Sequence, residues 1–280
     1  MQLWIWQHVR IELPDDWEML RFSRDGGQGR CAFADRYQFR LELSWRAGGP
    51  PDMARLASDY LSKLKLDGAM PDATATRSDG WQGIEGHQDG LATTRFARYL
   101  VAEHCLVETV FLWPGGRDLP LEERVLASVA AEAAQRGRFQ RWKAFGMDAL
   151  VTRGLALQDC EVQPASARLT FADGREARQE TFLRLGMVPE WLQGSVRDWL
   201  MRQKPRDVAL ASETASDRDG HAIASVAGSR RATLVRRKSR YEAAAWLCPA
   251  DGRLYCVATV GSDEPLGGRL SCCGHMGLAR

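Results

Sequence analysis

Two segments with the hydrophobic spacing of an amphipathic helix stand out in this chain. In residues 51–65, apolar side chains recur every three or four positions, which places them on one helical face. Pro51 is compatible with the first turn of such a helix. The run SDYLSKLK at 58–65 is echoed by RDWLMRQK at 197–204. The pattern therefore predicts two related helices, one in each half of the chain.

Alternation of apolar and polar positions predicts strands over much of the rest. In the first half the predicted strands cover residues 2–13, 18–23, 30–34, 38–45, 81–87, 91–101 and 105–113. The last two would pair as a hairpin. Residues 67–80 are expected to form a polar loop, and residues 121–136 to form the most regular helix.

The second half repeats this order of elements. Three short matches, in addition to the two helices, lie in the same order: Phe171-Ala172-Asp173 with Phe33-Ala34-Asp35, Asp219-Gly220-His221 with Asp79-Gly80-Trp81, and Trp246-Leu247-Cys248 with Tyr99-Leu100-Val101. A slowly growing offset between matches is typical of an internal duplication. We therefore predict two domains, 1–140 and 141–280, the second diverged by a basic hairpin insertion and a glycine-rich tail.

Runs of strands with few helices between them predict an α+β fold: two tandem similar domains, each a mainly antiparallel sheet with one or two packed helices. The order resembles the α/β/α sandwich of the PsbP-like superfamily, which includes the photosystem II extrinsic subunit and a Ran-release factor. Residues 11–17 (IELPDDW), 53–64 and 96–113 carry the resemblance. It implies a binding or assembly factor without a shared catalytic motif, and it assigns no functional residue.

Composition narrows the function classes further. The formal charge of +2 points to neither nucleic acid nor a membrane, and no apolar run approaches the ~20 residues of a membrane helix. The first residues lack the basic start of a signal peptide, so a cytoplasmic location is expected. Seven scattered cysteines then read as free thiols in a reducing compartment, and the ten tryptophans as mainly core residues.

A basic stretch supplies the candidate binding residues. Arg236, Arg237, Lys238 and Arg240 would form a positive ridge on a strand, suited to an acidic protein partner. The alternative is a solvated hairpin whose charges prevent edge-to-edge aggregation. No aromatic residues interleave with these charges, so nucleic acid is not expected as a partner. The oligomeric state stays open.

The cysteines give a weak metal signal. Cys272-Cys273-Gly274-His275 contains zinc-type ligands, but it is a single cluster with adjacent cysteines, whereas zinc sites usually use paired spacings. No metal site and no cofactor are therefore expected. Cys248 and Cys256 flank a turn. If Cys248 opposes Arg253, Cys256 points to the other face, so the two cysteines form neither a disulfide nor a ligand pair.

No common catalytic motif is present, and Glu103-His104-Cys105 is expected to be a solvated turn. The sequence predicts a non-enzymatic binding or assembly protein, which would bind through the groove between its halves or through the basic hairpin. The alternative is a hydrolase-type enzyme with a site at the inter-domain interface. Its candidate residues are His87, His221, Glu85 and Asp219, which occupy corresponding loops of the two halves.

Overall fold

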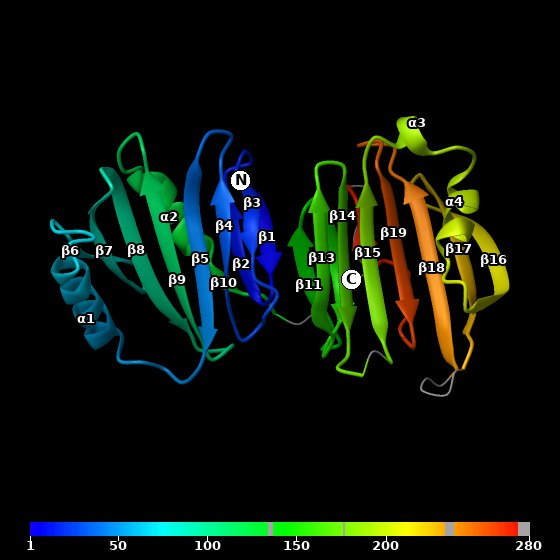
Figure 1. Cartoon of the computed structure of the whole chain (residues 1–280), viewed down its shortest axis with the longest axis horizontal. Coiled ribbons are helices and arrows are strands. Elements are labelled where there is room, and N and C mark those ends of the chain that lie inside the picture. Colours follow the sequence, from blue (N-terminus) through cyan, green and yellow to red (C-terminus); the bar gives the residue numbers. More distant parts are fainter. Residues whose placement is uncertain (134–136, 176, 233–237, 274–280) are drawn as a thin grey trace. The chain divides into compact units, whose positions relative to one another are not determined.

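The structure, a computed structural model, describes residues 1–133, 137–175, 177–232 and 238–273 (Figure 1). The chain divides into two compact units, Met1–Glu132 and Ala133–Arg280. The division falls a few residues before the predicted boundary at 140/141. The short strand β10 (Ala130–Ala131) pairs with β2 and so belongs to the first unit.

The first unit is built around a seven-stranded antiparallel sheet with the order β3-β4-β5-β9-β8-β7-β6. A smaller set of strands, β10-β2-β1, lies beside it. Its elements are β1 (Gln2–Trp6), β2 (Val9–Leu13), β3 (Glu18–Phe22), β4 (Gln28–Ala34), β5 (Phe39–Ala47), α1 (Met53–Leu66), β6 (Thr74–Ser78), β7 (Trp81–Gln88), β8 (Leu91–Leu100), β9 (Cys105–Trp113) and α2 (Leu119–Ser128).

The second unit has a seven-stranded antiparallel sheet with the order β13-β14-β15-β19-β18-β17-β16. Strands β11, β12 and β20 form its smaller set. Its elements are β11 (Phe139–Ala144), β12 (Met147–Thr152), β13 (Ala156–Gln163), β14 (Ser166–Ala172), β15 (Gln179–Leu185), α3 (Val188–Trp191), α4 (Val196–Gln203), β16 (Val208–Arg218), β17 (His221–Arg230), β18 (Ser239–Leu247), β19 (Leu254–Val260) and β20 (Leu270–Ser271).

The two large sheets have the same strand order: β3 in the first unit corresponds to β13 in the second, β9 to β19 and β6 to β16. The hairpin that precedes each large sheet, β1–β2 or β11–β12, is the first hairpin of its unit. In each unit a tryptophan of the first hairpin packs edge-on against a phenylalanine of the large sheet. Trp4 meets Phe33 with ring centroids 5.5 Å apart, and Trp142 meets Phe171 at 4.9 Å. Nine of the ten tryptophans are buried, which confirms their prediction as core residues. The duplication itself stays a prediction.

The predicted α+β class is wrong. Strands account for 52% of the described residues and helices for 14%, so the architecture is mainly antiparallel β, largely sandwich-like. The helices bury few residues of their own: Leu64 of α1, Glu122, Val125 and Leu126 of α2, Val188 of α3, and Trp199 and Leu200 of α4. One core lies between each large sheet and its smaller set of strands, because the first hairpin of each unit turns an apolar face inward. A further cluster in the second unit lies where α3 and α4 pack on the other face of the large sheet.

Three predicted elements differ from the structure for reasons that lie within a few residues. The predicted helix at 121–136 ends at Ser128, because Val129 is extended and leads into β10. Residues 2–13 form two strands, since Gln7 adopts positive φ and closes a turn between them. The predicted loop at 67–80 contains the edge strand β6. Its side chains are mostly polar and exposed, so the sequence shows no apolar alternation there. None of the helices in the described ranges has the length and hydropathy that a bilayer span requires. The cytoplasmic location stays a prediction.

A single glycine governs how closely β16 approaches β17. A Cβ built on Gly228 would overlap the carbonyl oxygen of Ala209, next to the bulge between Leu210 and Ser212. Gly228→Ala is expected to destabilise the second unit by about 1–3 kcal/mol, because the backbone must move apart. Gly48→Ala is the matched control, as a Cβ there meets nothing within 4 Å. Faster hydrogen exchange of β16 amides in Gly228→Ala alone would support this, and equal exchange in both variants would contradict it.

Candidate partner-binding groove

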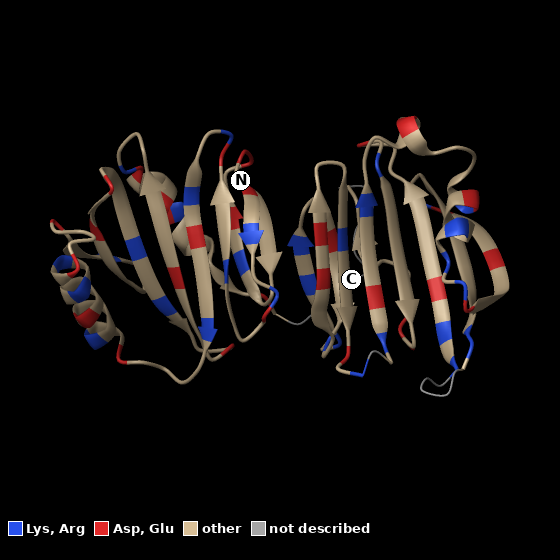
Figure 2. Cartoon of the chain, viewed as in Figure 1, with Lys and Arg blue, Asp and Glu red and all other residues tan. Residues whose placement is uncertain are grey.

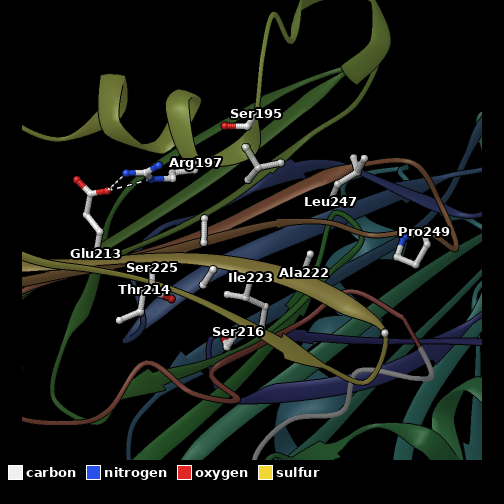
Figure 3. Close-up of a pocket in the computed structure, with 14 residues that line it drawn as sticks. Ser195, Arg197, Glu213, Thr214, Ser216, Ala222, Ile223, Ser225, Leu247 and Pro249 are labelled. Carbon is white, nitrogen blue, oxygen red and sulfur yellow. Dashed lines mark hydrogen bonds and ion pairs between the residues drawn. The ribbon is translucent and has the colours of Figure 1, made fainter.

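A groove of about 660 Å³ lies in the second unit between the start of α4 and the β16–β17 hairpin (Figure 3). Apolar side chains line much of it, namely Val196, Ala215, Ala222, Leu247 and Pro249. The alanines leave room on its floor because they are small. The end of β18 forms the wall opposite α4 in the close-up. The groove can therefore take up an apolar side chain of a ligand.

The N-terminus of α4 is fixed by a capping box. The Ser195 hydroxyl accepts a hydrogen bond from the Asp198 N–H at 3.1 Å, and the Asp198 carboxylate accepts one from the Ser195 N–H at 3.3 Å. The Ser195 hydroxyl also donates to that carboxylate and lowers the pKa of Asp198. Trp199 and Leu200 anchor the helix on the sheet. The first turn of α4 is thereby held over the groove.

An ion pair forms one rim of the groove. Arg197 Nε donates to Glu213 Oε2 at 2.9 Å, and this hydrogen bond raises the pKa of Arg197 (Figure 3). The pair connects α4 with β16. Its side chains are 65% and 32% exposed, so it adds little to stability.

The strand below this rim is an exposed sheet edge. β16 stands last in the strand order and, among the described strands, pairs with β17 alone. It is 11 residues long and mostly exposed, and it contains neither proline nor lysine. Natural edge strands are usually protected by shortness, by charged residues or by bulges. β16 has a bulge between Leu210 and Ser212 and charges at Glu213, Asp217 and Arg218, which leave residues 208–212 without a charged side chain. Backbone groups on its outer side are available to another strand.

The groove has few polar side chains. Ser195 lies at its rim, in the capping box of α4. Thr214, Ser216 and Ser225 also border the groove, but they alternate along β16 and β17 with Ala215 and Ala224, so their hydroxyl groups turn to the other face of the sheet. Among the described residues that line it, the ionisable ones are Arg197 and Glu213, which pair with each other.

The predicted basic ridge is only partly visible. Arg236 and Arg237 lie outside the described residues. Lys238 is exposed, and Arg240 is exposed and forms an ion pair with Glu242. Figure 2 shows basic and acidic residues following one another along the strands of both units. The ridge and its acidic partner stay predictions.

The residues of the enzyme alternative have separate partners within each unit. His87 Nδ1 lies 2.7 Å from Asp72, and both side chains are at least half exposed. The His87 backbone N–H also lowers the pKa of Asp72. Glu85 pairs with Arg117. His221 is buried, whereas Asp219 is exposed on the preceding turn. A hydrolase site at the inter-domain interface stays a prediction.

The turn after β18 has the predicted register. The Cys248 N–H donates to the Arg253 carbonyl at 2.9 Å, and Cys256 lies on the other face, in the core beneath α4. Burial raises the pKa of Cys256 to about 12. Cys248 lies instead beside His221, Cys272 and Cys273. His275, part of the tail motif, lies outside the described residues.

Sequence reasoning missed the groove because its parts are far apart along the chain. One signal was present. Residues 208–218 read VALASETASDR, a run whose later positions are polar on both faces, as in an exposed edge strand, and which contains neither proline nor lysine. No pattern in the sequence indicates that Leu247 and Pro249 form a wall of the groove, since these residues reach it only through the pairing of β18 with β17.

Comparison with known proteins gives distant likenesses only. No protein-family model and no curated protein matches the chain. A solved structure from Bacteroides thetaiotaomicron shares 16% identity over 52% of this chain, with a TM-score of 0.28, and the match spans half (50%) of that chain.

Two further solved structures match more of the chain. The T6SS immunity protein TplEi of Pseudomonas aeruginosa, complexed with an "L" peptide, covers 94% of this chain and 87% of its own, with 6% identity and a TM-score of 0.35. The Tle4–Tli4 complex covers 94% and 86%, with 6% identity and a TM-score of 0.34. Likenesses this weak assign neither a family nor a function to the chain, and the PsbP-like resemblance stays a prediction.

Proposed function

We propose that this chain is a non-enzymatic binding protein whose second unit takes up an extended segment of a partner protein along β16. The observation that carries the proposal is a long, exposed sheet edge bordering an apolar groove. The edge provides main-chain hydrogen bonds and the groove a place for a side chain. This combination is typical of recognition by strand addition.

The geometry of strand addition explains how both features would be used. An added strand lies about 4.8 Å from β16, and its side chains alternate between the two faces of the sheet. On the α4 face a long apolar side chain would reach past Ala215, because alanine is too small to block it. Burying such a side chain stabilises a complex by about 1.5–3 kcal/mol. The proposal therefore favours partners with leucine- or phenylalanine-sized residues at alternate positions.

A groove variant tests the function directly. Random dodecapeptides displayed on phage would be selected on the purified full chain, and an enriched peptide measured by fluorescence anisotropy. Leu247→Arg is expected to weaken this peptide by about tenfold or more, equal to ~1.4 kcal/mol, because the new charge enters the groove. Leu247 is 40% exposed, so the variant should fold. Leu66→Arg on α1, where the side chain is 87% exposed, is the matched control.

Hydrogen exchange locates the bound segment. Addition of the enriched peptide is expected to slow exchange of amides in β16, since outward N–H groups gain acceptors. The proposal would be overturned by protection elsewhere with β16 unchanged. Equal affinity of the two arginine variants would also overturn it, as would a selection that enriches no peptide.

A further inference from the structure

We propose that the second unit binds one zinc ion through His221, Cys248, Cys272 and Cys273. The site is independent of the groove, because His221 and Cys248 lie on the sheet face opposite α4. The four ligands come from three places: the start of β17, the turn after β18, and the segment after β20. All their ligand atoms lie within 4.8 Å of one another.

The spacing of these atoms is that of a tetrahedral zinc site. Bond lengths of ~2.3 Å to sulfur and ~2.05 Å to nitrogen place two sulfurs roughly 3.8 Å apart, and a sulfur and a nitrogen roughly 3.6 Å apart. The Sγ atoms of Cys272 and Cys273 are 3.9 Å apart, and His221 Nε2 lies 3.4 and 3.6 Å from them. A disulfide would require ~2.05 Å between the sulfurs. None of the cysteines, all of which lie in the described residues, forms a disulfide.

The imidazole of His221 is oriented for ligation. Its Nδ1 lies 2.9 Å from the carbonyl oxygen of Asp219. A carbonyl can only accept a hydrogen bond, so Nδ1 carries the proton and the lone pair of Nε2 faces the sulfurs. The turn that aims the ring uses positive φ at Asp219 (51°) and Gly220 (76°). A metal-binding histidine usually donates its other N–H to such an acceptor.

The thiol groups also have the donors expected around a metal thiolate. The backbone N–H groups of Ala250 and Asp251 donate to the sulfur of Cys248. Gly252, at φ 66°, closes this turn, and its N–H donates to the Cys248 carbonyl at 2.9 Å. The indole N–H of Trp246 points at the sulfur of Cys272, 3.3 Å away. Such outer hydrogen bonds orient and stabilise ligating thiolates.

At the corresponding position of its large sheet, the first unit has a cation–π contact and a hydrogen bond in place of metal ligands. Continuing the β7–β8 register by one residue sets Trp81 opposite Arg98, and continuing the β17–β18 register by two sets His221 opposite Cys248. The Arg98 guanidinium lies 4.6 Å from the Trp81 ring and donates to the carbonyl of Val129, in the segment after α2. In the second unit, metal ligation would connect the closing segment to the sheet instead.

The ligand set indicates zinc in a structural role. Three thiolates and one imidazole are soft and borderline donors that favour zinc over magnesium or calcium. With four protein ligands, no coordination position remains for a substrate. His221 and Cys248 are buried, and the two tail cysteines are partly buried. In the sequence, Cys272 and Cys273 form a motif with His275. In the described fold, these two cysteines lie beside His221 and Cys248.

Metal content is the primary test. The full chain, produced in zinc-supplemented medium and purified without chelator, is expected to carry about one zinc ion per chain by mass spectrometry of the native protein. Cobalt added to the chelated protein should give an intense near-ultraviolet thiolate charge-transfer band. Cys272→Ser should lose most of the zinc, and His221→Cys should retain it. Cys160→Ser, outside the cluster, is the matched control.

Alkylation provides a second readout that does not depend on variants. The partly buried Cys272 and Cys273 should react with iodoacetamide only after chelator is added, whereas buried Cys31, Cys248 and Cys256 should stay unmodified. Zinc below about a tenth of an equivalent, no cobalt band and unchanged alkylation would together overturn the proposal. If Cys272→Ser fails to fold, the zinc content and the cobalt titration of the unmodified chain decide the question.

Discussion

Arg269→Met is expected to lower the unfolding free energy of the second unit by about 3–5 kcal/mol, because it leaves a buried carboxylate without its cation. Arg269 is 2% exposed and pairs with Glu180, which is 0% exposed. Its Nε and Nη2 atoms also donate to the Leu150 carbonyl at 3.0 and 2.8 Å. The guanidinium lies against the rings of Phe139 and Phe182. One side chain thus connects the closing segment to both sets of strands.

The size of the effect follows from what Glu180 retains. Its carboxylate still accepts hydrogen bonds from the Thr152 N–H at 3.0 Å and hydroxyl at 2.5 Å, but it has no countercharge. The double variant Arg269→Met/Glu180→Gln should recover much of the loss, because no unpaired charge remains. Arg168→Met, which removes an ion pair with Glu161 in which both side chains are about half exposed, should change stability by less than about 0.5 kcal/mol.

Urea unfolding combined with peptide-resolved hydrogen exchange measures this effect and assigns it to a unit. Amides of β12, β15 and β20 should exchange faster in Arg269→Met. A loss below ~1 kcal/mol, or a double variant as unstable as the single one, would contradict the prediction.

Arg117→Met is expected to destabilise the first unit by about 3 kcal/mol. The side chain of Glu122 on α2 is 1% exposed, and Arg117 donates to both of its oxygens, with Nε at 3.1 and 3.3 Å. Thr94 Oγ1 donates to the same carboxylate at 2.5 Å. Arg117 also pairs with Glu85 of β7, so it connects α2 to the large sheet. Because Arg117 is 27% exposed whereas Arg269 is 2% exposed, this ion pair is less completely shielded from water, and the lower end of the range of about 3–5 kcal/mol applies.

A matched pair of variants separates the two carboxylates. Glu85→Gln should have a small effect, because the Glu85 side chain is 38% exposed and water replaces its partner. Glu122→Gln removes the buried charge and should reduce the additional cost of Arg117→Met. Urea unfolding of the unmodified protein, Arg117→Met, Glu122→Gln and the double variant gives this coupling energy as a double-mutant cycle. A coupling near zero would show that Glu122 does not depend on Arg117.

Local pattern sufficed for the strands. The pair 91–101 with 105–113, and the turn in which Cys248 opposes Arg253, follow from alternation interrupted by a short turn, which depends only on neighbouring residues. The helices near 51–65 and 197–204 were found for the same reason, since one apolar face is visible within a few turns. Polar edge strands such as β6 were not predicted, because they have no buried face and therefore no apolar alternation.

The fold class failed where burial depends on distant pairing. A helical face in the sequence does not show how much of a sheet it covers, and α1 buries one residue. That the first hairpin of each unit covers one face of the large sheet was decided by contacts such as Trp142 with Phe171. Tertiary packing therefore turned a predicted α+β pattern into a mainly antiparallel β structure.

The sequence by itself determined where most strands begin and end, which tryptophans are available for a core, and that cysteines gather near residue 272. Only the tertiary structure decided that Cys248 and His221 meet those cysteines, and that β16 is left at an open edge beside a groove. The physical reason is one of range. Backbone preference and hydrophobic alternation act between neighbours, whereas ligand sets and grooves depend on which strands pair across the whole unit.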